Sequence, residues 1–81
     1  MVRPFKVIIK KYEEGFVAQA VGFQGAVVGE GETYEEALAD VTSAIRTALE
    51  TFGEEALDRE FPVQDVTVAE VRVAVDAEVS R

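Results

Sequence analysis

The stretch "GEGETYEEALAD", residues 29–40, marks the point where a strand is expected to give way to a helix. Thr33 suits the N-cap of that helix, and Glu36 lies three residues later, which is the spacing of a capping box. A glycine-rich turn between a strand and a helix can also hold phosphate. Tyr34, however, stands where a dinucleotide-binding loop needs its third glycine, and no Lys-Ser/Thr pair follows. The pattern therefore predicts a capped turn and not a phosphate site.

Downstream of this turn, apolar residues recur at three- and four-residue spacing, which predicts an amphipathic helix over residues 34–52. Gly53 suits the residue that ends the helix, because that position prefers a left-handed backbone. The apolar stripe comprises Ala37, Leu38, Val41, Ala44, Ile45, Ala48, Leu49 and Phe52. The opposite face carries Glu35, Glu36, Asp40, Arg46 and Glu50.

Upstream, three short strands are predicted. Phe5, Val7 and Ile9 alternate with polar or less buried positions, as in a strand with one face in the core. Gly15 ends an acidic turn and gives it the backbone freedom that a hairpin needs. The expected strands span residues 5–10, 16–21 and 26–28, with the hairpin turn at residues 12–15.

A last strand is predicted from Asp65 onward. The polar residues 54–60 either add a helical turn or stay irregular, and Pro62 argues against helix beyond them. The valines fall into two groups of opposite parity: Val66 and Val68, then Val71, Val73, Val75 and Val79. A bulge near residues 69–70, or a second half that pairs elsewhere, would reconcile the two groups.

Composition excludes several classes of protein. The 81 residues suit one domain, with its core over about residues 4–75 and an acidic tail at 76–81. The absence of cysteine and histidine removes thiolate sites, the commonest general base and the commonest metal ligand.

The net charge is −8, yet residues 1–12 carry +4 and the remainder −12. Such a surface disfavours nucleic acid and membranes and suits a basic partner, although solubility alone would also explain it. With no membrane-length apolar run and no signal peptide, a cytoplasmic protein is expected.

The order and spacing of these motifs resemble the HicB-like antitoxin family. The matching features are the strand Phe5–Ile9, the acidic turn ending in Gly15, the Gly-Glu-Thr turn with its Glu-Glu-Ala-Leu helix start, and the last strand at 66–75. Residues 22–26 keep the glycine of a family segment at Gly25 but replace its proline and cysteine. The resemblance implies an α+β, partial RNase H-like fold of order β-β-β-α-β. Its three-stranded antiparallel meander carries one long helix, and a final strand lies parallel to the first, in sheet order 3-2-1-4.

The resemblance also implies a function: neutralising a small basic HicA-type mRNA-interferase toxin by protein–protein contact. The candidate contact residues are Glu30, Glu32, Glu35 and Glu36. Many family members continue into a DNA-binding domain, which is not expected before Arg81, so a separate subunit would have to supply autorepression. No direct nucleic-acid binding by this chain is expected.

Three alternatives stay open. The first is a solitary homo-oligomer, a dimer or tetramer of unknown ligand, with Val71, Val73 and Val75 pairing with their copies in the interface. The second, a nucleic-acid-binding domain, would depend on a thin set of bases: Arg3, Lys6, Lys10 and Lys11. The third is carboxylate binding of Mg²⁺ or Ca²⁺ at Glu30, Glu32 and Glu35. Catalysis is not expected, because the first strand lacks the acid that RNase H-type nucleases carry there, and no cofactor is expected.

Overall fold

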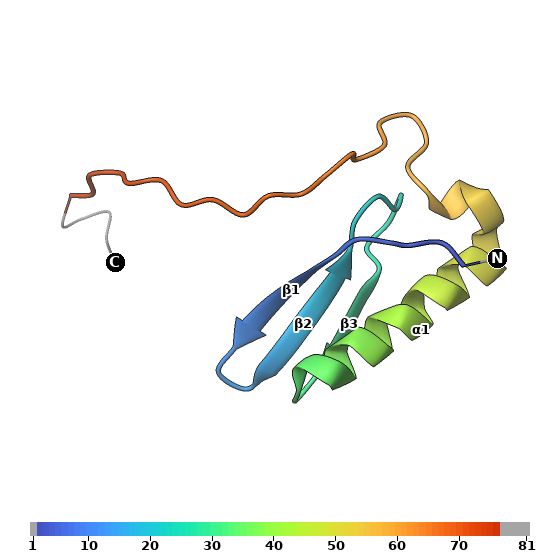
Figure 1. The fold of residues 1–81 in the computed structure, drawn as a ribbon, viewed down its shortest axis with the longest axis horizontal. Coiled ribbons are helices and arrows are strands. Elements are labelled where there is room, and N and C mark those ends of the chain that lie inside the picture. The colour runs from blue at the N-terminus through green and yellow to red at the C-terminus, as the bar shows by residue number, and fades with distance from the viewer. Residues whose placement is uncertain (1, 77–81) are drawn as a thin grey trace.

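A computed structural model describes residues 2–76, which form a three-stranded antiparallel sheet with one helix packed on it (Figure 1). This confirms the predicted α+β class, the meander and the single long helix. The elements are β1 (Val7–Tyr12), β2 (Gly15–Ala20), β3 (Val28–Gly31), α1 (Tyr34–Phe52) and the 3-10 helix η1 (Gly53–Ala56). The third strand begins two residues later and ends three residues later than predicted, and both glycines assigned to the turn lie inside it.

The register of the sheet decides which side chains meet the helix. Val7 pairs with Ala20, and Ile9 pairs with Ala18. Across the next ladder Ala18 pairs with Gly29. These residues therefore share one face of the sheet, since side chains alternate along each strand. That face carries Val7 and Ile9 on β1, whereas β2 and β3 present alanine and glycine to the helix except at Phe16, which meets Tyr34 at the helix start.

The helix lies over β2 and β3 and makes no close approach to β1. Alanines and glycines on those two strands let the helix backbone come near the sheet, so the core is thin. The buried cluster consists of Ala18, Ala20, Ala37, Val41 and Ile45. Phe52, which was assigned to the apolar stripe, is 64% exposed at the end of the helix.

Both ends of α1 have the caps that the sequence predicts. The backbone N–H of Glu36 donates to Thr33 Oγ1 at 3.1 Å. The Glu36 carboxylate reaches back one residue further than in the usual box and accepts from the N–H of Glu32 at 2.8 Å. At the other end Gly53 takes φ 61° and donates its N–H to the carbonyl of Leu49. The extra turn considered after the helix is present as η1.

The predicted final strand is wrong for the single chain. Residues 65–76, called the arm below, belong to no helix or strand and run away from the sheet (Figure 1). No backbone hydrogen bond joins the arm to β1, so the described sheet ends at β1 and the order 3-2-1-4 is not completed. The bulge considered near residues 69–70 is therefore absent from the single chain, because those residues pair with no strand. Val79 and the rest of the predicted tail at 77–81 lie outside the described residues.

Candidate functional site

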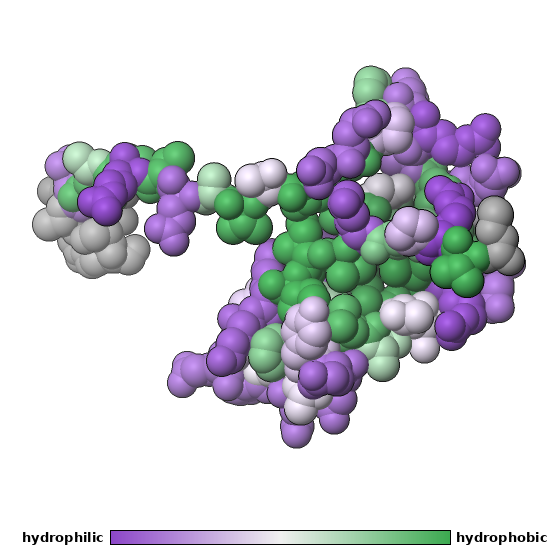
Figure 2. Space-filling model, in the orientation of Figure 1, coloured by the Kyte–Doolittle hydropathy of each residue, from purple (hydrophilic) through white to green (hydrophobic). Residues whose placement is uncertain are grey.

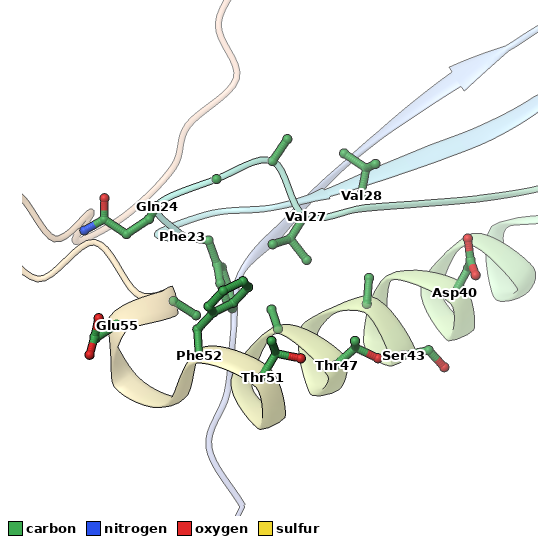
Figure 3. Close-up of a pocket in the computed structure, with 15 residues that line it drawn as sticks. Phe23, Gln24, Val27, Val28, Asp40, Ser43, Thr47, Thr51, Phe52 and Glu55 are labelled. Carbon is green, nitrogen blue, oxygen red and sulfur yellow. The ribbon is translucent and has the colours of Figure 1, made fainter.

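A groove of about 820 Å³ opens on the surface of the described part of the chain. It lies between the second half of α1 and the chain that leads into β3 (Figure 3). Phe23 and Phe52 lie at one end of the groove, and Asp40 lies at the other. Its remaining wall residues include Val27, Val28, Ala44 and Ala48, with the hydroxyls of Ser43, Thr47 and Thr51 along the helix. An apolar side chain from another molecule would fit such a lining.

The groove exists because the sheet is shorter than the helix. The four residues of β3 extend about 13 Å, whereas the 19 residues of α1 extend about 28 Å. The second half of α1 therefore faces the loop at 21–27, and Ala44 and Ala48 leave room there. The sequence placed both alanines on the apolar stripe of the helix, and the structure leaves them half-buried beside the groove. The signal that could have predicted this is the mismatch between strand and helix length.

The four predicted contact residues, Glu30, Glu32, Glu35 and Glu36, do come together where β3 meets α1, and all are exposed. Glu14, which sequence reasoning missed, lines a smaller hollow of about 390 Å³ with Glu30 and Glu32. Its position follows from topology, because the β1–β2 turn and the end of β3 share one end of an antiparallel meander. These residues form the acidic end: Glu14, Glu30, Glu32, Glu35 and Glu36.

Asp40 connects the acidic end to the groove. Its Oδ2 accepts a hydrogen bond from the backbone N–H of Glu30 at 2.9 Å, and the residue also lines the groove. This contact ties the second half of β3 to the second turn of α1. The groove and the acidic end therefore adjoin at Asp40, with the phenylalanines at the far end of the groove.

Within residues 2–76 the carboxylates of the acidic end form no ion pair, and the ion pair present is Lys6–Asp65 at 3.6 Å. The pKa of Asp65 lies below its usual range, first because its carboxylate accepts the N–H of Val66, and second because Lys6 is near. No group of three or more acidic side chains in this part of the chain converges as a metal site would. The cation site considered at Glu30, Glu32 and Glu35 thus gains no geometric support.

Four of the basic residues lie on β1 and the segment before it: Arg3, Lys6, Lys10 and Lys11. Arg3 stacks over the ring of Phe5 at 5.2 Å, and Lys11 lies 5.9 Å from the ring centre of Phe16. Tyr34, the first residue of α1, packs edge-on against the same Phe16 ring at 6.4 Å. Within residues 2–76, no helix has both the length and the apolar character needed to cross a membrane.

No protein-family model matches the chain, and neither a curated protein nor a solved structure matches it. The groove and the acidic end are therefore the features of this chain that indicate a function. A surface that offers an apolar groove beside exposed carboxylates is suited to a protein whose own surface pairs an apolar side chain with basic ones.

Proposed function

We propose that the chain is an antitoxin-type binding module of the HicB-like kind, with a partial RNase H-like fold. In this proposal it neutralises a small basic mRNA interferase of the HicA type by protein–protein contact and catalyses no reaction. The observation that carries the proposal is that Asp40 both lines the groove and accepts a hydrogen bond from the backbone of Glu30 in the acidic end. An apolar side chain of the partner enters the groove while its basic residues meet the carboxylates.

The charge distribution supports a partner that binds RNA. A protein that cleaves RNA needs a basic surface for phosphates, and the exposed carboxylates of the acidic end attract the same surface. Bound there, the chain would exclude RNA by occupying its site. Every buried side chain within residues 2–76 is apolar, so the charged groups lie on the surface, where a macromolecule can reach them.

The test begins with a pull-down of the tagged chain from its native lysate, read by mass spectrometry. The purified partner must then cleave RNA, and the chain must stop that cleavage at a one-to-one ratio. A triple variant, E30K/E32K/E35K, reverses three charges of the acidic end. We expect about tenfold or greater loss of affinity, mainly through slower association, with the difference shrinking in high salt.

Two controls separate this contact from general charge and from folding. The variant E50K/E54K/E60K makes the same change in net charge at exposed positions of the helix end and beyond it, and should keep its affinity. Glu36→Gln removes a fourth charge while preserving the capping hydrogen bond. Equal loss in both triple variants, or none in either, would contradict the proposed contact.

A second candidate is a solitary homo-oligomer with no cognate toxin. It is favoured by the valines of the arm, which are 54–86% exposed at positions 68, 71, 73 and 75. Such a row of apolar side chains is uncommon on an isolated small domain. Recovery of only the chain itself in the pull-down would favour this candidate over toxin neutralisation.

A further inference from the structure

The outer edge of β1 is unpaired. Within the described sheet, β1 forms a ladder with β2 alone, so the outward N–H and C=O groups of Val7–Tyr12 have no strand partner. An open edge of this length readily accepts another strand. The helix does not cover β1 either, and Val7 and Ile9 remain half-buried on the helix side of the sheet.

The arm has the pattern of a strand with one apolar face. Val71, Val73 and Val75 lie on one side of an extended chain, 83%, 72% and 54% exposed. The alternate positions are Glu70, Arg72, Ala74 and Asp76. Figure 2 shows apolar residues at intervals along the arm and a larger apolar area over the body of the molecule. The arm therefore carries an apolar face that this chain does not cover.

The edge and the arm are complementary. A strand beside β1 that turned Val71 and Val73 to the helix side would lie against Val7 and Ile9 and continue the core. The charges also agree: the arm holds three acids and one arginine, whereas residues 1–12 hold four bases and no acid. The arm would give the outer edge of β1 hydrogen-bond partners for its backbone, and the valines of the arm and Val7 and Ile9 of β1 would cover one another. The opposite charges of the two segments would add to the attraction.

The direction of the arm indicates which molecule supplies the edge. The arm starts beside β1, at the Lys6–Asp65 ion pair, and then runs away from its own sheet (Figure 1). Each chain offers one arm and one open edge, so two chains related by a two-fold axis satisfy both. We propose that the arm adds to β1 of a second copy, giving a strand-exchanged dimer in which each sheet has four strands.

This proposal does not depend on toxin binding, and it differs from an interface in which the arms pair with each other. The fourth position beside β1, which the family resemblance assigns to the same chain, is here filled by the partner copy. The contact surface would be β1 of one protomer and the valine face of the arm of the other.

Two neighbouring lysine substitutions test the valine face in the full chain. Val73→Lys places a charge on the apolar face, and Ala74→Lys places the same charge one residue along, on the other face. Both positions are exposed in the single chain, so neither change disturbs its core. By light scattering across micromolar concentrations, V73K should weaken dimerisation about tenfold or more, and A74K should dimerise like the parent. A parent that is monomeric throughout, or equal effects of the two variants, would overturn the proposal.

A spin label identifies the acceptor strand. The chain has no cysteine, so Ala74→Cys gives a single labelling site on the arm. Labelled A74C at natural isotope abundance is unfolded and refolded with ¹⁵N-labelled parent chain. Broadening of the Val7–Lys11 amides in the ¹⁵N chain is the expected result, because it can arise only between chains. Broadening confined to β3, or seen only when label and isotope share one chain, would overturn strand exchange onto β1.

Discussion

Gly29 lies directly against the backbone of Val41. A Cβ atom built on Gly29 would stand 2.6 Å from the Val41 Cα and closer still to the Val41 nitrogen. Gly31 is similarly placed, with its Cβ position 2.8 Å from the nitrogen of Ala37. The G-x-G pair that resembles part of a phosphate loop therefore serves the close packing of α1 on β3.

The first prediction concerns this approach. Gly29→Ala should lower the free energy of unfolding by about 3 kcal/mol, because backbone atoms of α1 must move to admit the methyl group. Gly25→Ala is the matched control: no atom lies within 4 Å of its added Cβ, and its cost should stay within about 0.5 kcal/mol. Urea unfolding followed by circular dichroism measures both. Similar values for the two variants would show that the helix does not sit this close.

The second prediction concerns the N-cap of α1. Thr33→Ala removes the acceptor of the Glu36 N–H and should cost about 1 kcal/mol of unfolding free energy. Thr47→Ala makes the same change at an exposed position inside the helix, where it should cost nothing or stabilise slightly, since alanine favours helix. Thermal and urea unfolding compare the pair. An inert Thr33→Ala would argue that the helix begins elsewhere.

The third prediction separates the two apolar positions that sequence assigned to one stripe. Ile45 is 9% exposed and Phe52 is 64% exposed. Ile45→Ala should cost about 3 kcal/mol through lost burial and a cavity. Phe52→Ala should cost about 1 kcal/mol or less, although it removes the larger side chain, because most of that side chain is already in water. The reverse ranking in urea unfolding would place Phe52 in the core and close the groove.

The fourth prediction concerns Asp65, whose pKa lies below its usual range. A carboxyl with a lowered folded pKa favours the structure above its ordinary range, and that contribution is lost as pH falls through the folded value. The Lys6–Asp65 contact should accordingly weaken in acid. Carboxyl ¹³C titration by NMR should show the lowered pKa. In Lys6→Met the pKa should rise only part of the way, because the Val66 N–H still donates. If the pKa of Asp65 in Lys6→Met returned fully to its ordinary range, Lys6 alone would account for the lowered pKa, which would contradict the role of the Val66 N–H.

Local chemistry made parts of this fold predictable. Thr33 and Gly53 mark the ends of α1 because caps depend on the few residues around them. The bounds of β3 were misplaced because glycine is normally a strand breaker, yet Gly29 and Gly31 are needed in the strand to admit the helix. That requirement arises from tertiary packing, which a window of sequence does not contain.

The site shows the same division. Glu30, Glu32 and Glu35 could be grouped from sequence because they are neighbours in the chain. Glu14 and Asp40 could not, since their positions depend on how the hairpin and the helix fold back on β3. The alternation of valines in the arm predicts a strand with one apolar face. The same alternation does not identify the sheet edge with which that strand pairs, because that edge can belong to another molecule.

The small side chains between the helix and the sheet have a consequence for thermodynamics. Three of the five residues in the buried cluster are alanine. Folding of one chain thus withdraws little apolar surface from water, and the change in heat capacity on unfolding is correspondingly small. A small heat capacity change flattens the curve of stability against temperature. In a calorimeter, the isolated protomer would melt over a broad interval while varying little in stability from cold to warm conditions.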